Sequence, residues 1–519
     1  MADISRPLGR LLGVRREVAE PGDGGAERAP AGAEAIVVGG GIAGMSAAVV
    51  LAERGVRVRV LEARPWLGGR LAAWPDRLAD GTPQVVEHGF HAFFRQYYNW
   101  RSILRRVDDE LDFLRPVPGY PVLSASWPTE EFGRLPAAPP LNLLTLVARS
   151  PSLRLRDLRT MDGQAALPLL AYDPERTFAE WDGTTAAALL DSLRLPDRAR
   201  AMLFEVFSHS FFNLEADYSA AEMVANFHFY LLGNPEGLAF DAPYQDYDTA
   251  IWRPLADYVA ARGTEVLTDR PALGVERDGD SWRVRTADGM HAAPHLVLAV
   301  DPPALATLAE ASPDLAAAVP GGTTGSVTAA GPPYAVARYW LGGDVRPDRP
   351  IFSGVSRQST LDSVTLYHRL EQEPGRWARR TGGSVVELHA YACEPGVPAE
   401  ELAERMRREL ATLWPEVADL PVVELRARVE AQAPAFRPGG HATRPGVRTG
   451  AAGVYLSGDG IRTSFPSALM ERSAATGVLA ANHILRTYGV RTEPVWSIRP
   501  RGLLAARGRP APLGGVTPA

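Results

Sequence analysis

The stretch Ala35–Arg70, AIVVGGGIAGMSAAVVLAERGVRVRVLEARPWLGGR, decides the fold. The β-branched run Ile36–Val38 predicts a short buried strand. Three glycines follow it with the spacing G-x-G-x-x-G: Gly39, Gly41 and Gly44. They predict a tight turn into a helix that runs to about Arg54 and stops at Gly55. Valines then alternate with arginines over Val56–Val60, so the stretch predicts a strand–helix–strand unit of an α/β fold.

The same unit predicts a dinucleotide site, against the alternative of a glycine-rich turn without a ligand. In this context the first glycine permits the turn, the second lets a pyrophosphate approach the backbone, and the third lets the helix pack on the strand. The helix N-terminus offers free N–H groups and the positive end of the helix dipole. The second strand ends at Glu62, 18 residues after Gly44. That is close to the spacing of about 20 at which an acidic side chain binds a ribose hydroxyl.

A second loop, Arg64-x-x-x-Gly68-Gly69-Arg70, follows Glu62 directly. It predicts further contacts to a pyrophosphate, since arginine donates hydrogen bonds in a fork to phosphate oxygens; an ordinary Gly-Gly turn is the alternative. GxGxxG, then Glu, then RxxxGGR resembles the FAD-binding N-terminus of the flavin amine oxidase and carotenoid desaturase superfamily. The resemblance implies a Rossmann-like FAD-binding domain of the glutathione-reductase-like, amine-oxidase type. It implies FAD contacts at Gly39, Gly41, Ile42, Ala43, Gly44, Glu62, Ala63, Arg64, Gly69 and Arg70.

Composition excludes several kinds of chemistry. The chain has 519 residues, which predicts two domains, and a net charge of −6, which argues against nucleic acid as a partner. All 55 basic residues are arginine, so no lysine is available for a Schiff base or beside a flavin. Cys393 is the single cysteine, which excludes intrachain disulfides and cysteine-ligated clusters. No metal site is expected.

The segment Gln84–Trp100 has the most unusual composition of the chain. A valine strand leads to Gly89, with two histidines and six aromatic side chains within a few positions. An aromatic plug of the core is one interpretation. The wall of a site is the other, because Gly89 would let the backbone approach a flat ring.

A Glu-x-Gly-x-His-x-x-Phe stretch of this kind lies against the flavin in carotene desaturases, which implies FAD contacts at Gly89 and Phe90. The fuller match, EHGFHAFFRQYYNWRSILRRVD and then FLRPVPGYPV, resembles the bacterial carotenoid ring desaturase/methyltransferases, also called isorenieratene synthases. That resemblance implies an FAD-dependent oxidoreductase that turns a β-ionone ring into an aromatic ring with a 1,2-methyl shift. Glu87 and His91 are candidates for the proton acceptor. Aromatic faces that could stabilise a transient cation are those of Phe90, Phe93, Phe94, Tyr97 and Tyr98. Core packing is the alternative for each.

Near the C-terminus, the strand Gly453–Ser457 ends in Gly458-Asp459, and a helix is predicted from near Pro466 to a point before Gly489. The superfamily resemblance implies that Gly458 and Asp459 lie near the ribityl chain and pyrophosphate. It also implies that the helix N-terminus, with Met470, faces the flavin N1–C2=O edge and stabilises negative charge there.

Domain boundaries follow from these motifs. The FAD-binding domain is assigned to residues 34–100, 245–305 and 445–490, interleaved with an α+β substrate domain at 101–244 and 306–444. Six phenylalanines between 204 and 229 either line an apolar tunnel or fill a core. Residues 1–33 are predicted to be a disordered arm and 491–519 a loose tail.

Residues 141–147 form a proline-broken apolar patch followed by arginines, which suits shallow insertion at an anionic membrane surface; a core helix is the alternative. The expected location is therefore cytoplasmic, peripheral on the cytoplasmic membrane. The expected partners are a carotenoid and an electron acceptor, either a quinone or oxygen. Other functions left open are an acyclic carotene desaturase, a non-oxidative flavin isomerase or mutase, and a protein that only carries FAD. A lysine-assisted amine oxidase is disfavoured, because the chain has no lysine.

Overall fold

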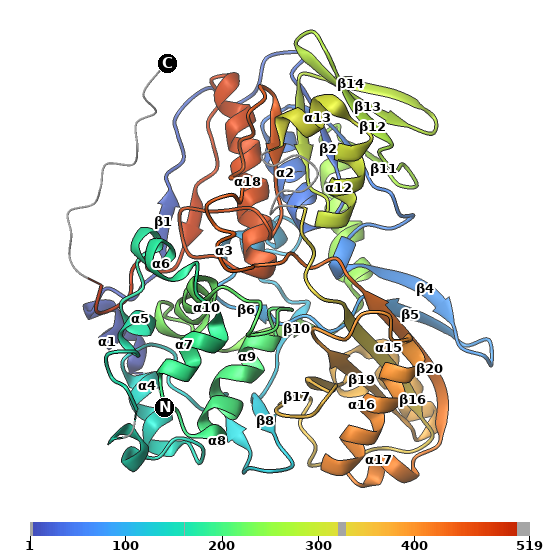
Figure 1. The fold of residues 1–519 in the computed structure, drawn as a ribbon. Coiled ribbons are helices and arrows are strands. Elements are labelled where there is room, and N and C mark those ends of the chain that lie inside the picture. Colours follow the sequence, from blue (N-terminus) through green and yellow to red (C-terminus); the bar gives the residue numbers. More distant parts are fainter. Residues whose placement is uncertain (1–3, 160, 320–327, 506–519) are drawn as a thin grey trace.

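The computed structural model describes residues 4–159, 161–319 and 328–505, and Figure 1 shows two lobes with a helical part beside the lower one. The upper lobe is built on a five-stranded parallel sheet in the order β11-β3-β2-β15-β21. Its strands are β2 (Glu34–Val38), β3 (Arg57–Leu61), β11 (Glu265–Leu267), β15 (His295–Leu298) and β21 (Val454–Leu456). The predicted Rossmann-like α/β fold is confirmed.

Two helices from opposite ends of the chain pack together against this sheet, α2 (Ile42–Glu53) and α18 (Leu469–Thr487). They approach closely because a glycine sits at the contact: a Cβ on Gly477 would lie 2.2 Å from the carbonyl oxygen of Ala43. Apart from Glu53, every residue of α2 is buried. The upper lobe also contains a meander of three antiparallel strands and four helices. These are β12 (Gly274–Asp278), β13 (Ser281–Thr286), β14 (Gly289–Ala293), α3 (Tyr98–Leu104), α11 (Arg253–Ala260), α12 (Pro302–Glu310) and α13 (Pro313–Ala318).

The second lobe contains a seven-stranded sheet in the order β20-β16-β19-β18-β17-β8-β9. Its strands are β8 (Pro121–Leu123), β9 (Glu130–Glu131), β16 (Tyr334–Leu341), β17 (Phe352–Val355), β18 (Ser363–Leu366), β19 (Ser384–Ala390) and β20 (Val422–Glu430). The amphipathic helix α16 (Ala399–Leu413) covers β16, β19 and β20 with Leu402, Met406 and Leu410. Around it lie α14 (Tyr367–Leu370), α15 (Gln372–Thr381) and α17 (Glu416–Asp419).

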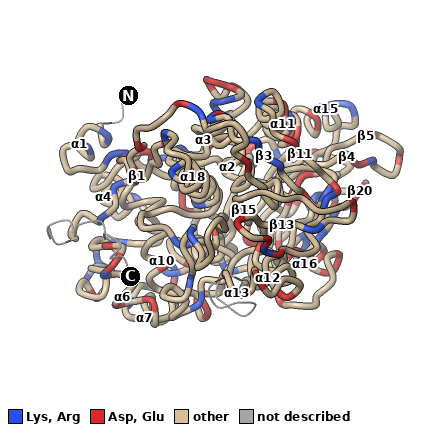
Figure 2. The backbone as a smooth tube through the Cα atoms, turned by 90° about the horizontal axis from the view of Figure 1, so that it is seen from above, with Lys and Arg blue, Asp and Glu red and all other residues tan. Residues whose placement is uncertain are grey.

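A helical part, lower left in Figure 1, adjoins this sheet. It comprises α4 (Leu141–Arg149), α5 (Leu167–Leu170), α6 (Pro174–Trp181), α7 (Ala186–Ser192), α8 (Asp197–Arg200), α9 (Val206–His209) and α10 (Ala220–Phe227). Three π-helical turns lie at Ala201–Glu205, His228–Leu232 and Asp248–Trp252. Short strands connect the lobes: β4 (Ala73–Arg77) with β5 (Pro83–Glu87), and β6 (Phe93–Phe94) with β10 (Phe240–Pro243) and β7 (Leu114–Pro116). Acidic and basic residues are interspersed along the described part of the chain (Figure 2).

The prediction of a disordered arm and a loose tail is wrong for the described part of both segments. Helix α1 (Ser5–Leu11) is followed by β1 (Glu17–Glu20), which pairs antiparallel with β22 (Val495–Ser497). Each segment is too polar to form a core alone, but the two hydrogen-bond to each other, and Val495 and Ile498 are buried. Residues 1–3 and 506–519 lie outside the described residues.

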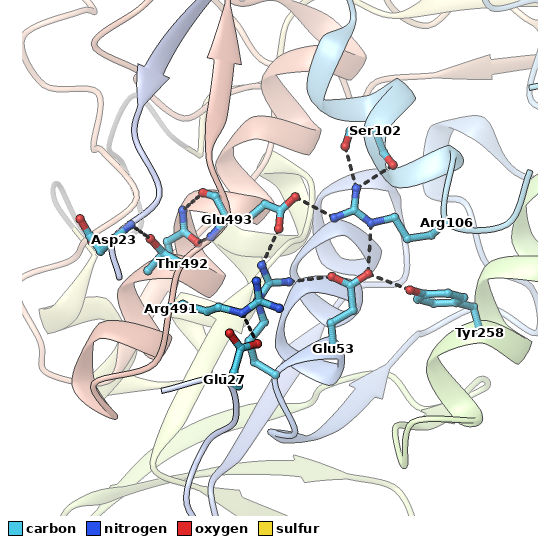
Figure 3. Close-up of polar contacts among 11 residues, drawn as sticks. Asp23, Glu27, Glu53, Ser102, Arg106, Tyr258, Arg491, Thr492 and Glu493 are labelled. Atoms are coloured by element: carbon cyan, nitrogen blue, oxygen red, sulfur yellow. Dashed lines mark hydrogen bonds and ion pairs between the residues drawn. The ribbon is translucent and has the colours of Figure 1, made fainter. Parts of the chain in front are cut away.

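A cluster of ion pairs fastens this terminal ribbon to the upper lobe (Figure 3). Glu493 accepts hydrogen bonds from Arg54 (2.5 Å) and Arg106 (2.7 Å). Both arginines also donate to Glu53, which accepts from the Tyr258 hydroxyl as well. Burial opposes the ionisation of Glu493, yet Arg106 and Arg54 lower its pKa below the ordinary value. The cluster therefore joins α2, the end of α3, α11 and the C-terminal segment.

Glu493→Gln is expected to lower the free energy of unfolding by about 2–3 kcal/mol, because it leaves two arginines, one of them buried, short of a counter-charge. Because the folded pKa of Glu493 is depressed, its contribution is present above the ordinary glutamate pKa and is lost as the pH falls through the depressed value. The midpoint of urea denaturation measures the effect. The matched control is Glu27→Gln, which removes an exposed pair with Arg491 and should cost under about 1 kcal/mol. Equal effects of the two variants would contradict this account of the cluster.

Candidate active site

One cavity of about 600 Å³ runs from the carboxyl ends of the upper sheet to the strands of the lower one. At its upper end the chain turns from β2 into α2 through Gly39, which has a φ of +104°. A Cβ on Gly44 would lie 2.0 Å from the carbonyl oxygen of Gly39, so this glycine allows the helix to start where it does. A Cβ on Gly41 would meet nothing closer than 3.7 Å, and Gly41 lines the cavity. The first turn of α2 is therefore open to a ligand.

Glu62 lies at the end of β3, on the wall of the same cavity. Its carboxylate accepts hydrogen bonds from the backbone N–H groups of Gly40 (2.7 Å) and Arg64 (2.9 Å). Burial raises the pKa of Glu62 above its ordinary value, and these two bonds oppose that rise. The bonds fix the carboxylate beside the glycine turn, as a ribose-binding residue requires.

The second glycine loop and the C-terminal Gly-Asp motif meet across the cavity. Arg70, in the 3₁₀ turn Gly69–Leu71, donates two hydrogen bonds to Asp459, of 2.9 and 2.5 Å. The sequence predicted each residue separately as a cofactor contact, and the structure places them in one fork-to-carboxylate pair on the cavity wall. Gly68 forms an isolated bridge with Gly41, so the two glycine loops lie side by side.

A cluster of buried charged side chains positions the turn that carries Asp459. Arg472 donates to the Asp459 carbonyl oxygen (3.3 Å) and contacts the carboxylate of Glu222 (3.4 Å), which also pairs with Arg444. Burial alone would raise the pKa of Glu222, but the two arginines lower it to about 2. The ionised Glu222 therefore fixes Arg472, and Arg472 fixes the turn that carries Asp459.

The C-terminal helix starts later than predicted. Helix α18 begins at Leu469, three residues after Pro466, with Ala468 at the N-cap position. Pro466 is not in its first turn, because its carbonyl accepts a hydrogen bond from the Ser497 hydroxyl and the chain remains extended up to Ala468. Leu469 and Met470 line the cavity. The N-terminus of α18 thus faces the cavity, as the sequence indicated, from a different starting residue.

The lower end of the cavity is a ring of aromatic side chains. Phe90 stacks on Phe352 with ring centroids 4.9 Å apart, and Phe240 meets both rings edge-on. Two hydroxyl groups of this wall pair with each other, that of Tyr97 with that of Tyr230, at 2.7 Å. The other aromatic residues of the lining are Phe94, Tyr120, Phe207, Phe211, Phe212, Tyr334 and Tyr391. Such a surface suits an apolar, partly planar ligand.

Most of the predicted cofactor residues line this single cavity. They are Gly39, Gly41, Ile42, Ala43, Glu62, Ala63, Arg64, Gly69, Arg70, Phe90, Gly458, Asp459 and Met470. Gly44 lies behind the lining, where it serves helix packing. Gly89 is also behind it: a Cβ there would meet the imidazole of His389 at 3.1 Å, so the close approach that it permits is to this histidine. Phe93, Tyr98, Phe204, Phe227 and Phe229 do not belong to the lining either, and they pack in or against the core.

The two candidate proton acceptors differ in position. His91 lines the cavity, and its Nδ1–H donates to the Gly89 carbonyl oxygen at 2.8 Å. Burial lowers the pKa of His91 to about 4. Glu87 is fully buried and does not line the cavity; it lies close to Arg338 and accepts from the backbone N–H of Tyr247. Burial raises the pKa of Glu87 to about 7, which Arg338 opposes. Glu87 is therefore not placed to accept a proton directly from a ligand in the cavity, since its carboxylate lies behind the lining.

Sequence reasoning missed the part of the wall that the lower sheet supplies. Tyr334 and Val336 come from β16, and His389 and Tyr391 come from β19 and the residue that follows it. The sequence placed this stretch in the α+β substrate domain at 306–444, but no chemistry was assigned to its residues. The spacing Glu387-x-His389-x-Tyr391 was the available signal, since alternate residues of a strand share one face.

Comparison with known proteins shows which protein family matches this chain. The family model for flavin containing amine oxidoreductases matches residues 42–485. The chain is 43% identical over 505 residues to a carotenoid phi-ring synthase of Streptomyces griseus, covering 96% of this chain and 97% of that protein. It is 30% identical over 616 residues to a carotenoid phi-ring synthase of Chlorobaculum tepidum, covering 92% of each.

Solved structures of low sequence identity share the fold. A cyclohexylamine oxidase from Brevibacterium oxydans superposes with a TM-score of 0.61 at 17% identity, over 88% of this chain and 99% of that one. A putrescine oxidase variant superposes with a TM-score of 0.62 at 15% identity, over the same shares. The cofactor is FAD, and the cavity fits it: an open glycine turn, an acidic side chain at the end of β3 and a helix N-terminus all face one space.

Gly41→Val is expected to abolish FAD binding while the protein stays folded. The added side chain enters the space beside the first turn of α2, where the nearest atoms of the protein are 3.7 Å from a Cβ. Flavin absorbance per mole of purified protein measures the loss, and circular dichroism reports the fold. Gly24→Val is the matched control, since Gly24 is also free of neighbours within 4 Å but lies outside the cavity lining. A yellow Gly41→Val protein would refute this placement of the cofactor.

Proposed function

We propose, starting from the fact that the chain belongs to the flavin containing amine oxidoreductase family, that it oxidises the cyclic end group of a carotenoid. Two relatives of nearly full-length similarity carry the name carotenoid phi-ring synthase. The aromatic end of the cavity supports the proposal independently, because it offers an apolar surface for a six-membered ring next to the FAD residues. The stacked and edge-on rings of Phe90, Phe352 and Phe240 carry this argument.

The reaction that we propose converts a β-ionone ring into an aromatic ring with a 1,2-methyl shift. One ring carbon carries two methyl groups, so loss of hydrogen alone cannot make the ring aromatic, and one methyl group must move to the neighbouring carbon. Two two-electron oxidations complete the change, and together they remove two hydrides and two protons from each ring. FAD, when bound, supplies the hydride acceptor, and the reduced flavin then needs an external oxidant, a quinone or oxygen.

The chain's own residues orient the ring and stabilise charge. Removal of a hydride leaves the ring electron-poor, and the faces of Phe90 and Phe352 offer the negative part of an aromatic quadrupole to such a cation. A contact of this kind contributes roughly 0.5–2 kcal/mol. The aromatic wall offers few polar partners for water, which favours rearrangement of a cation formed there over capture by water.

We also propose that the enzyme takes its substrate from an anionic lipid surface. The side chains of Leu11 and Leu144, on α1 and α4, are 84% and 62% exposed, and those of Ile4, Leu12 and Leu167 are exposed as well. Helix α1 lies beside the start of α4 in Figures 1 and 2, and the Ser5 hydroxyl accepts from the backbone N–H of Ala138. We call these five side chains the leucine patch. Exposed arginines lie on or after the same two helices: Arg10 on α1, Arg149 at the end of α4, and Arg154 and Arg156 shortly after it.

The start of α4, the helix that carries Leu144 of the leucine patch, packs close to the lining of the cavity. Ala137, just before α4, touches Gly237, and the next residue, Leu238, lines the aromatic end of the cavity. This contact brings the start of α4 close to the aromatic end of the cavity, and we propose that a hydrocarbon enters from this side. Among the described residues no helix is both long and apolar enough to span a bilayer. A forty-carbon hydrocarbon leaves the bilayer at a cost of about 0.8 kcal/mol per CH₂, so we expect direct transfer from the surface.

The proposed reaction is tested by expressing the chain in a bacterium that accumulates β-carotene and weighing the pigments. The expected products have lost four hydrogens per converted ring and keep the carbon count of the substrate, because the methyl group moves and is not lost. Gly24→Val should give the same products and Gly41→Val none. Products of acyclic chain desaturation in a lycopene-pathway strain, together with untouched β-carotene, would instead favour an acyclic desaturase.

The lipid surface is tested with Leu11→Glu combined with Leu144→Glu. We expect co-sedimentation with liposomes of phosphatidylglycerol and phosphatidylcholine to fall at least about tenfold, since two carboxylates replace apolar side chains beside anionic lipid. FAD content should not change. Leu146 is unsuitable for this test, because α4 turns it into the core. Val423→Glu, an exposed apolar position on β20, is the matched control and should bind like the unmodified protein. Undiminished binding of the double variant would exclude the leucine patch as the contact surface.

A further inference from the structure

Three polar side chains on and next to one strand lie at the apolar end of the cavity. Glu387 and His389 alternate along β19, and Tyr391 directly follows its last residue, Ala390, so the three share a face. His389 and Tyr391 line the cavity, and Glu387 lies fully buried behind His389. Polar groups are few in this aromatic wall, and these are held by one continuous chain of hydrogen bonds.

The carboxylate of Glu387 is the fixed end of this chain. It accepts from the backbone N–H of Phe90 (2.7 Å), from the Arg338 guanidinium (2.8 Å) and from Nε2 of His389 (2.7 Å). Burial alone would raise the pKa of Glu387, but Arg338 and His389 lower it well below its ordinary value. The group is therefore a charged acceptor at neutral pH.

An ionised carboxylate can only accept, so the bond to Glu387 places the imidazole proton of His389 on Nε2. Nδ1 then carries a lone pair, and the hydroxyl of Tyr391 lies 3.2 Å from it. The hydroxyl of Ser363, 3.3 Å from that of Tyr391, completes the chain on the other side. The arrangement is a base with its orienting carboxylate on one side and a cavity-facing hydroxyl on the other.

We propose that His389 is the proton acceptor of the ring oxidation, that Tyr391 passes the proton to it, and that Glu387 is the positioning residue. This rests on the proposed function. After the ring has given up a hydride to the flavin, a C–H bond next to the cationic carbon breaks, and its electron pair forms the new C=C bond. The proton goes to the Tyr391 oxygen while the hydroxyl proton moves to Nδ1 of His389. Charge is conserved, because the cation of the ring becomes an imidazolium beside the Glu387 carboxylate.

The alternative acceptor in the cavity wall, His91, is less suited to hold a proton. Its Nδ1–H is bound to the neutral carbonyl oxygen of Gly89, which provides no full counter-charge. Burial lowers the pKa of His91 to about 4. An imidazolium at His389 would lie 2.7 Å from a carboxylate oxygen, whereas one at His91 would have its charge balanced only at greater distance.

The two histidines are thus expected in opposite tautomers, which can be tested without turnover. The protein is labelled with ¹⁵N-histidine, and long-range ¹H–¹⁵N spectra are recorded with FAD bound and without it. The signals of His389 and His91 are assigned by their loss in His389→Gln and His91→Gln. We expect the proton on Nε2 in His389 and on Nδ1 in His91. A proton on Nδ1 of neutral His389 would overturn the proposal, because that nitrogen would then have no lone pair to receive another.

The catalytic test compares His389→Gln and Tyr391→Phe. Glutamine keeps an N–H donor for Glu387 but is not a base, and phenylalanine removes a single oxygen. With FAD content unchanged, each variant should lower kcat for ring oxidation at least about 100-fold, the size of a general-base contribution, with KM within about threefold. The matched control is His228→Gln, a buried histidine outside the cavity whose Nε2 bonds to the Arg499 carbonyl, and it should keep the full rate.

The outcomes are separable. If His389→Gln oxidises the ring at a rate within threefold of the unmodified enzyme, the proposal is overturned. If Tyr391→Phe leaves this rate unchanged, the proton transfer through the Tyr391 hydroxyl is overturned. If His389→Gln fails to fold, Tyr391→Phe and the tautomer measurement decide. If the unmodified enzyme oxidises no carotenoid ring at all, the proposed function fails instead, and the tautomer result still stands on its own.

Discussion

The nucleotide end of this molecule depends on two glycines, because each lets two backbone segments touch with no side chain between them. Gly44 lets α2 start against the carbonyl of Gly39, and Gly477 lets α18 cross α2 at the carbonyl of Ala43. Any side chain at either position would push a helix away by about an ångström. The first turn of α2 and the N-terminus of α18 consequently point into the same cavity from opposite ends of the chain. The position of the cofactor follows from this packing as much as from the residues that touch it.

The local sequence was sufficient to predict those parts of the site that depend on a particular backbone conformation. The glycine spacing, the strand ending at Glu62 and the Gly458-Asp459 turn each indicate one conformation, because few other conformations use those residues. The pairing of Arg70 with Asp459 could not be foreseen in this way, since 389 positions separate the partners and nothing local specifies it. The terminal ribbon was missed for the same reason. Glu17–Glu20 is too polar to be recognised as a strand until its partner Val495–Ser497 is present.

The aromatic segment after Gly89 shows where composition misleads. Phe90 and Phe94 line the cavity, whereas Phe93 between them is fully buried, so proximity in sequence did not decide which rings belong to the site. Gly89 was interpreted as room for a flat cofactor, and it provides room for His389. The alternation of residues along β19 was a better indication of which side chains belong to the site. A glutamate, a histidine and a tyrosine at period two in an otherwise apolar strand place three polar groups on one buried face, which is costly unless each has a partner.

The buried charges of the lower lobe show how an apolar cavity can accommodate a cationic reaction. Arg338 lies between Glu87 and Glu387. The ring of Tyr367 covers the face of its guanidinium group, with 3.7 Å between the Arg338 Cζ atom and the ring centroid. Burial raises the pKa of Glu87 and of Glu371, and Glu87 raises the pKa of Glu371 further, so Glu387 is the carboxylate that stays charged with Arg338. That pair is neutral as a whole, yet its negative end is the one that faces His389 and the cavity wall. A dipole fixed in this direction costs nothing to reorganise when a positive charge forms in the ring, whereas free water or a mobile side chain would have to turn first. The proposed reaction would thus take place in apolar surroundings, with one oriented negative group beside His389, where the proposal places the transferred proton.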